Sequence, residues 1–165
     1  MSYPQYVLEL LVTEEAKPYY PAVGTVEFPP DGNAGYDLKV VTDQAPIPGA
    51  TLFPLGVKGR MLRETTHEAG VVVIDDSHFT LEPRSSIYKF GFMMANSRGI
   101  IDKTYRGQLM APVISVGPVQ KSIEAGTRLF QVLAPDLGYI YKVVYVDSLP
   151  ETQRGEGGFG STGTK

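Results

Sequence analysis

The segment Asn96-Ser-Arg-Gly-Ile-Ile-Asp-Lys-Thr-Tyr-Arg-Gly-Gln-Leu109 organises the rest of the chain around it. It carries a turn signal at Ser97-Arg98-Gly99, then two β-branched residues, a carboxylate, an aromatic ring and a second glycine at Gly107. This order predicts a strand, a tight turn and a second strand, with Asp102 and Tyr105 presented between two glycines. The tip of such a hairpin offers backbone groups that can read a planar heterocycle. For this segment alone, an ordinary hairpin with an incidental Asp and Tyr is the alternative.

Other short segments of strand-forming residues surround this one. We expect strands at residues 6–12, 36–41, 51–58, 70–74, 78–81, 90–95, 108–116, 127–132 and 139–146. Residues 18–35 contain four prolines and three glycines, which predicts a long surface loop. No long window carries an apolar helical stripe. Many short strands separated by glycine and proline predict an all-β sandwich or barrel, with a jelly roll as its two-sheet form.

Composition limits the possible classes of protein. A chain of 165 residues with 42% hydrophobic residues most simply forms one globular domain. The net charge of -3 does not suggest a nucleic-acid groove, and the absence of cysteine excludes disulfides and thiolate zinc sites. His67 and His78 are isolated in the sequence and do not suggest a metal pair. Residues 1–12 lack a basic region and a long apolar run, so we expect an intracellular protein without membrane contact.

The chain changes character after Val146. Residues 154–165 contain five glycines and one phenylalanine, so this segment cannot order itself by burying apolar surface. The sequence therefore predicts a β domain at residues 1–150 and a flexible C-terminal arm at residues 151–165. A frayed terminus is the alternative, although an arginine, a phenylalanine and a Ser-Thr pair among glycines are unusual for one.

Five clusters stand out along the chain. They are Ala34-Gly-Tyr-Asp-Leu38, Pro83-Arg-Ser-Ser86, the central segment 96–109, Gly126-Thr-Arg-Leu-Phe-Gln-Val132 and Arg154-Gly-Glu-Gly-Gly-Phe-Gly-Ser-Thr-Gly163. Together, and in this order, they resemble the five motifs of the trimeric deoxyuridine triphosphatases (dUTPases). The resemblance covers residues 34–163. The distance from Asp37 to Arg84 is long for that family, which suggests an inserted or extended hairpin between them.

Several of these residues suit phosphate binding. Arg84 offers a rigid fork of donors, and Ser85 and Ser86 add hydroxyl and backbone donors. A solvated turn is the alternative for these three residues. The resemblance assigns Gln131 to the α-phosphate region, although an edge-strand residue facing water is an equal reading. Arg128 is left without a role.

A carboxylate can orient and deprotonate a water molecule, and Asp102 is our candidate for this catalytic role. The resemblance implies attack on the α-phosphorus of dUTP, giving dUMP and pyrophosphate, a step of nucleotide metabolism that supplies dUMP. It also implies that Asp37 supports Arg84 and a hydrated metal. Mg²⁺ prefers phosphate oxygens and water, so we expect it without a direct protein ligand.

The resemblance further implies how the substrate is recognised. Tyr105 packs against the sugar, backbone groups near Asn96, Gly99 and Ile101 read the base, and Phe159 stacks on it. The arm acts as a lid, and its phosphate-binding residues are Arg154, Gly160, Ser161 and Thr162. The family resemblance also implies a homotrimer with shared active sites, in which the arm reaches the site of another subunit.

Three other interpretations remain at this point. A dCTP deaminase of the same fold needs a catalytic Glu on the strand after the central segment, where this chain has Leu109-Met-Ala-Pro-Val-Ile114 without an acid. A non-catalytic nucleotide-binding regulator would not need Asp102 and the intact arm. A structural jelly-roll protein would explain the strands but not the five clusters.

Overall fold

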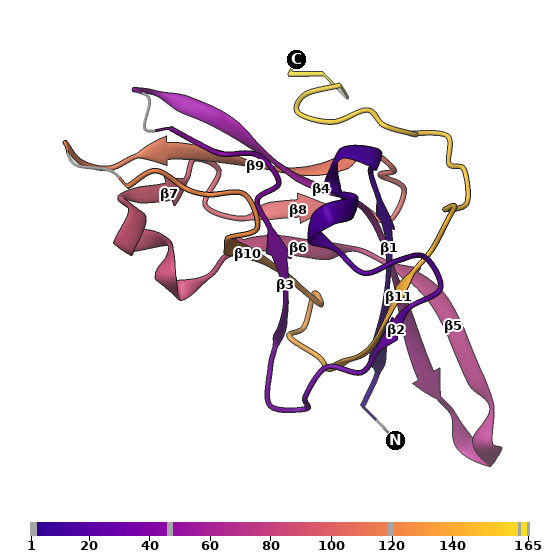
Figure 1. The fold of residues 1–165 in the computed structure, drawn as a ribbon. Coiled ribbons are helices and arrows are strands. Elements are labelled where there is room, and N and C mark those ends of the chain that lie inside the picture. Colours follow the sequence, from indigo (N-terminus) through magenta and orange to yellow (C-terminus); the bar gives the residue numbers. More distant parts are fainter. Residues whose placement is uncertain (1–2, 46–47, 119–120, 162, 165) are drawn as a thin grey trace.

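The chain folds into two β-sheets, as described by a computed structural model for residues 3–45, 48–118, 121–161 and 163–164 (Figure 1). The larger sheet has seven strands in the order β2 (Val26–Glu27), β11 (Ile140–Tyr145), β1 (Gln5–Val12), β4 (Ala50–Thr66), β9 (Gln108–Ser115) and β7 (Phe92–Met94), with β5 (Val72–Ser77) paired to β4. The smaller sheet has the order β3 (Gly35–Lys39), β10 (Arg128–Leu133), β6 (Phe79–Pro83) and β8 (Gly99–Ile101). The predicted all-β, two-sheet fold is confirmed.

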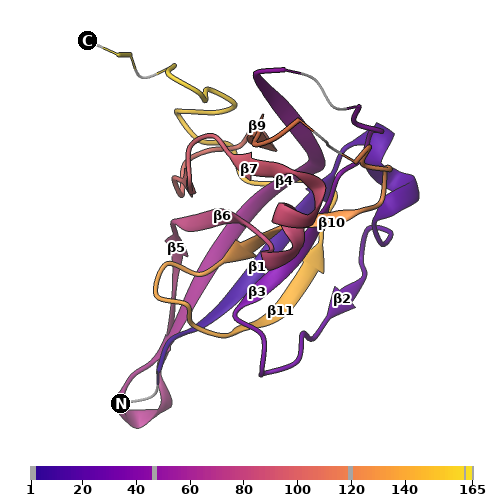
Figure 2. The same ribbon diagram turned by 90° about the vertical axis from the view of Figure 1, so that its left-hand side faces the viewer.

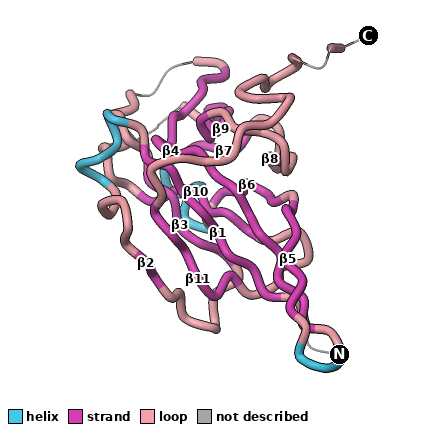
Figure 3. Tube along the Cα trace, turned by 90° about the vertical axis from the view of Figure 1, so that its right-hand side faces the viewer, coloured by secondary structure: helices cyan, strands magenta, loops and turns pink. Residues whose placement is uncertain are grey.

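Among the described residues, helical structure is limited to three short 3-10 turns, η1 (Glu14–Tyr19), η2 (Glu68–Gly70) and η3 (Ser85–Phe90) (Figure 3). Within the part of the chain that the structure describes, no helix is long and apolar enough to cross a lipid bilayer.

The hydrophobic core lies between the two sheets. On β9, Leu109, Ala111 and Val113 are buried while the residues between them are half-buried, which is the period-2 pattern of a strand with one face on a core. Phe53 of the larger sheet meets Phe130 of the smaller sheet edge-to-face, with ring centroids 6.3 Å apart. These contacts hold the two sheets face to face.

The strands β4 and β5 form the extended hairpin that the distance from Asp37 to Arg84 suggested. β4 runs for 17 residues and pairs with β5 from Met61↔Ser77 to Thr66↔Val72. The end of the hairpin projects from the body of the molecule (Figure 2). Residues 59–66 were not predicted as strand. Met61 is buried, but residues 62–66 are half-buried or exposed, so this part of β4 lacks the alternation of buried apolar and exposed polar residues that indicates a strand.

The prediction of a hairpin within the central segment is wrong. β8 pairs with β6 of the smaller sheet, whereas β9 pairs with β4 and β7 of the larger one. The turn from Asp102 to Tyr105 therefore connects the two sheets. The buried guanidinium of Arg106 donates hydrogen bonds to the carbonyls of Lys103 and Tyr105, which are then not free for a hairpin ladder.

Further boundaries differ from the prediction. The strand expected at residues 70–74 begins and ends later, as β5. The strand expected at residues 90–95 shrinks to β7, because η3 occupies the chain up to Phe90 and ends at Gly91, whose φ is +72°. The loop expected at residues 18–35 is partly internal. The buried Tyr20 donates a hydrogen bond to the carbonyl of Leu55 at 2.7 Å, and β2 adds a short strand to the larger sheet.

Candidate active site

A cavity of about 160 Å³ opens beside the end of β8, and we call it the Asp102 cavity. It brings together six residues that the sequence predicted for the base, the sugar and catalysis. These are Asn96, Gly99, Ile101, Asp102, Tyr105 and Phe159. Leu81, Ile100, Gln108, Leu109, Met110, Arg154 and Gly158 complete the lining.

The Tyr105 ring forms a fixed wall of this cavity. A Cβ on residue 107 would lie 2.4 Å from the Tyr105 hydroxyl oxygen, so only glycine lets the ring fold back over Gly107. The hydroxyl donates a hydrogen bond to the carbonyl of Gln108 at 2.9 Å. Burial raises the pKa of the Tyr105 hydroxyl, and the nearby Arg154 guanidinium opposes part of this shift. The ring is therefore a neutral, oriented surface at physiological pH.

Asp102 follows β8 directly, and its carboxylate faces two basic groups. Oδ2 accepts a hydrogen bond from Nη1 of Arg154, and Oδ1 lies 3.5 Å from Nδ1 of His78. The guanidinium of Arg154 also lies over the Tyr105 ring, 5.6 Å from its centroid. A carboxylate held by Arg154, with 44% of its side chain exposed, remains accessible to a water molecule.

The C-terminal arm lies against its own chain, close to this cavity. The N–H of Arg106 donates to the carbonyl of Gly155 at 2.7 Å, and the Thr152 hydroxyl donates to the carbonyl of Thr104. Glu156 forms an ion pair with Lys58 of β4. These contacts bring Arg154 to Asp102.

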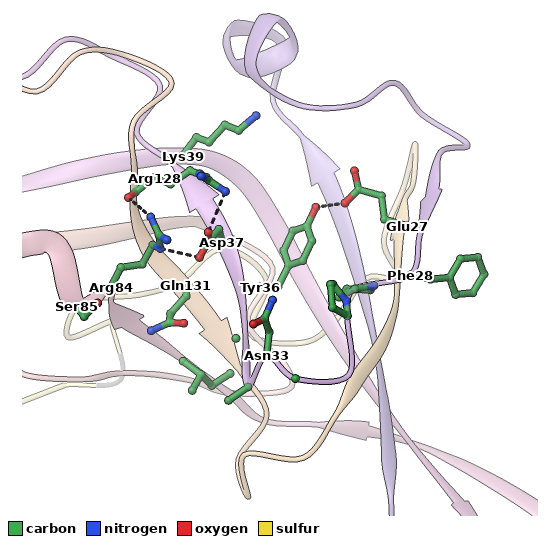
Figure 4. Close-up of a pocket in the computed structure, with 16 residues that line it drawn as sticks. Glu27, Phe28, Asn33, Tyr36, Asp37, Lys39, Arg84, Ser85, Arg128 and Gln131 are labelled. Carbon is green, nitrogen blue, oxygen red and sulfur yellow. Dashed lines mark hydrogen bonds and ion pairs between the residues drawn. The ribbon is translucent and has the colours of Figure 1, made fainter.

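A second and larger hollow, of about 760 Å³, lies along β3 and β10, and we call it the Arg84 groove (Figure 4). It contains four predicted residues, Asp37, Arg84, Ser85 and Gln131, together with the cations Lys39 and Arg128. Nε of Arg84 lies 2.9 Å from Oδ1 of Asp37, and Nη1 of Arg128 lies 3.4 Å from Oδ2 of the same carboxylate. The lining carries three cations, Lys39, Arg84 and Arg128, against two carboxylates, Asp37 and Glu27. This leaves a net positive charge that suits an anion.

Strand pairing, a hydrogen bond and a neighbouring glycine orient the side chain of Gln131 in the groove. The β3–β10 ladder sets Gln131 opposite Asp37, and the side-chain amide of Gln131 donates to the carbonyl of Pro83 at 3.2 Å. A Cβ on residue 35 would lie 2.2 Å from Oε1 of Gln131. Gly35 therefore provides the space in which this amide lies.

The cavity and the groove lie at opposite ends of β6. The register Phe79↔Ile101 puts Asp102 beside the start of β6, whereas Arg84 follows its end. The five residues of β6 lie between these two ends, and an extended strand of this length spans roughly 17 Å. Within one chain, Asp102 and Arg84 therefore face separate hollows.

Comparison with known proteins identifies a family that matches this chain. Residues 26–163 match the family model described as dUTPase, a span that includes all five clusters.

The chain belongs to the dUTPase family.

Curated dUTPase relatives cover most of the chain. Each of the following is named deoxyuridine 5'-triphosphate nucleotidohydrolase. The protein of Tolumonas auensis is 34% identical over 83% of this chain and 85% of its own length. That of an Enterobacter species is 37% identical over 81% and 83%. That of Caulobacter vibrioides is 36% identical over 87% and 84%.

Two solved dUTPase structures share the fold. The EIAV enzyme matches with a TM-score of 0.52 and 18% identity, over 87% of this chain and 93% of its own. The enzyme of Streptococcus mutans matches with a TM-score of 0.53 and 22% identity, over 86% and 99%. At sequence identities this low, the structural similarity is evidence for the fold alone.

Some predicted dUTPase residues lie outside both hollows. Ser86 belongs to η3, and Gly160 and Ser161 lie in the exposed part of the arm; none of the three lines the cavity or the groove. Thr162 lies outside the described residues.

Sequence reasoning missed three residues near the predicted dUTPase motifs. Lys39 and Arg128 line the groove, and His78 lies beside Asp102. Lys39 carried a detectable signal, because residues 37 and 39 of one strand point to the same face. His78 carried no local signal, since only strand pairing brings it to Asp102.

Proposed function

We propose that this member of the dUTPase family hydrolyses dUTP to dUMP and pyrophosphate. The observation that carries the proposal is the family match over residues 26–163, together with the gathering of Asp102 and Tyr105 in one cavity. A deaminase of similar fold is disfavoured, because β9 carries Pro112 and no acid.

In the proposed reaction, Asp102 orients a water molecule and takes its proton. The water oxygen forms a bond to the α-phosphorus, while the bond from that phosphorus to the oxygen bridging to the β-phosphate breaks. Pyrophosphate then leaves with the bridging oxygen. Partial exposure of the Asp102 carboxylate supports this role, since a general base must lie within hydrogen-bond reach of its water.

We propose that the Arg84 groove receives the phosphates. Nε of Arg84 pairs with Asp37 and Nη1 donates to the carbonyl of Arg128, which fixes the guanidinium and leaves Nη2 as a donor for phosphate oxygens. Arg128 contacts the other oxygen of the same carboxylate and adds a second guanidinium beside Arg84.

We propose Mg²⁺ as the cofactor. The oxygens of Asp37 are engaged by Arg84 and Arg128, and the described residues hold no group of three or more His, Cys, Asp or Glu side chains. This donor set fits a cation that arrives on the triphosphate and meets Asp37 through water, with no direct protein ligand. When bound, the cation withdraws charge from the phosphate oxygens.

We also propose a homotrimer with shared active sites. The separation of Asp102 from Arg84 along β6 supports sharing, because one substrate cannot readily meet both within a single chain. A neighbouring copy that presents its Arg84 groove to the Asp102 cavity would complete the site.

The activity is tested by pyrophosphate release. We expect the purified protein with Mg²⁺ to release pyrophosphate from dUTP, and to act much more slowly on dCTP and UTP. Removal of Mg²⁺ by EDTA should abolish release, and added Mg²⁺ should restore it. Deamination of dCTP, or equal rates on all three nucleotides, would contradict the proposed function.

Tyr105→Ala should narrow the preference for dUTP over UTP, by roughly 10-fold or more. The ring packs against Gly107 and Gly158 and forms a wall of the Asp102 cavity, so its removal should widen the cavity and admit a 2′-hydroxyl. Competition between dUTP and UTP measures the ratio of their kcat/KM values. Tyr105→Phe is the matched control, since it keeps the ring and loses only the hydrogen bond to Gln108. An unchanged ratio in the alanine variant would assign discrimination to other residues.

A further inference from the structure

His78 lies at the joint between β5 and β6, next to the catalytic turn. The antiparallel register Phe79↔Ile101 makes His78 the cross-strand neighbour of Asp102. Its Nδ1 lies 3.5 Å from Oδ1 of Asp102. Backbone pairing, rather than side-chain flexibility, therefore brings an imidazole to the carboxylate.

The imidazole of His78 holds the peptide bond that follows Asp102. The backbone N–H of Lys103 donates a hydrogen bond to Nδ1 of His78 at 3.1 Å. An accepting Nδ1 carries a lone pair, so the neutral ring holds its proton on Nε2. In this state His78 acts as an acceptor for the turn and leaves Oδ1 of Asp102 free for another donor.

Other contacts hold the carbonyls of the same turn. The N–H of Tyr105 donates to the carbonyl of Asp102 at 2.9 Å, and Arg106 donates to the carbonyls of Lys103 and Tyr105. The hydrogen bond to His78 adds a restraint on the Asp102–Lys103 peptide plane. That plane restrains ψ of Asp102 and hence the position of its Cβ, while Arg154 holds the carboxylate itself.

We propose that His78 is a positioning residue for the hydrolytic reaction. Through the N–H of Lys103 it fixes the turn, so that the Asp102 carboxylate points at the attacking water. This inference rests on the proposed function. A base that is misdirected by a fraction of an ångström loses rate without losing substrate affinity.

Three substitutions at His78 test the role of the acceptor. In His78→Asn, Oδ1 of the amide can take the position of Nδ1, whereas in His78→Gln the amide lies one bond further out. In His78→Ala no acceptor remains. We expect kcat for dUTP to fall roughly 10-fold in the Ala and Gln variants, with a smaller change in KM, and to return close to the wild-type value in the Asn variant.

A readout that does not need activity is hydrogen exchange of the Lys103 amide, measured by NMR. We expect faster exchange in the Ala and Gln variants and near wild-type protection in the Asn variant. The exchange rates test the His78–Lys103 link even if the wild-type protein fails to hydrolyse dUTP. A failure of the proposed function is thereby distinguished from a failure of this inference.

The matched control is the other histidine of the chain, His67, which is exposed near the tip of the β4–β5 hairpin. His67→Ala should leave kcat unchanged. Equal kcat values in wild type and all three His78 variants would overturn the inference. An equal loss in all three would also overturn it, because the loss would then follow ring shape rather than the acceptor. If the Ala variant does not fold, the Asn and Gln variants carry the same comparison.

Discussion

Replacing Asp102 by asparagine is expected to lower kcat for dUTP by at least roughly 10²–10⁴-fold, the contribution typical of a general base. Asparagine keeps the size of the side chain and can still accept a hydrogen bond from Arg154, but it cannot take a proton from water. Binding of dUTP should therefore survive, and KM should change much less than kcat. Steady-state rates of pyrophosphate release, with dUTP affinity measured by calorimetry, separate these two effects.

A matched control for this substitution is Asp75→Asn. Asp75 is an exposed carboxylate of β5 on the outer hairpin, and it lines neither the cavity nor the groove. Its replacement removes the same charge from the protein without touching the site, so turnover should stay near the wild-type rate. Near-normal turnover in Asp102→Asn would remove Asp102 from its assigned role.

Mixed oligomers should regain activity that neither parent possesses. One parent is the Asp102→Asn chain, which keeps Arg84; the other is an Arg84→Gln chain, which keeps Asp102. The two residues lie at opposite ends of β6, so a complete site needs the cavity of one chain and the groove of another. After joint unfolding and refolding at equal amounts, about a quarter of the sites in a randomly mixed homo-oligomer should pair an intact Asp102 with an intact Arg84.

Each parent refolded alone provides the baseline, and native mass spectrometry verifies that mixed trimers have formed. If every chain served its own site, each site would lack one of the two residues and activity would stay at the baseline. Baseline activity in confirmed mixed trimers would therefore reject sharing between the cavity and the groove, and would leave the role of Asp102 untouched.

The same design identifies the chain that supplies the arm. The Asp102→Asn chain, which keeps its arm, is mixed with a chain that ends before Arg154. The family resemblance predicts recovery, with an arm reaching across to a neighbour. The contacts of Arg154 and Glu156 within their own chain predict none. Recovered activity would assign the arm to another subunit, and its absence would assign it to the subunit that carries Asp102.

Local sequence was sufficient for the fold class, and most of the residues predicted for the site line the cavity or the groove. Alternating apolar residues, as on β9, and frequent glycine and proline produce short strands wherever they occur. The clusters around Asp37, Arg84 and Asp102 carry their chemistry in residue type and spacing, which can be read along the chain. Gly107 was read only as a second glycine of the central segment, and the structure shows that the Tyr105 ring fills the space its missing Cβ leaves.

Long-range pairing decided the rest, because hydrogen bonding between strands depends on partners that are distant in sequence. The central segment looked like a hairpin, yet β8 and β9 belong to different sheets, and the buried Arg106 stabilises the turn between them. The ladder of β6 with β8 brought His78 to Asp102, and the length of β6 separated Asp102 from Arg84. The sequence by itself determined which groups are available for the chemistry, and the register of β6 decided which of them meet within one chain.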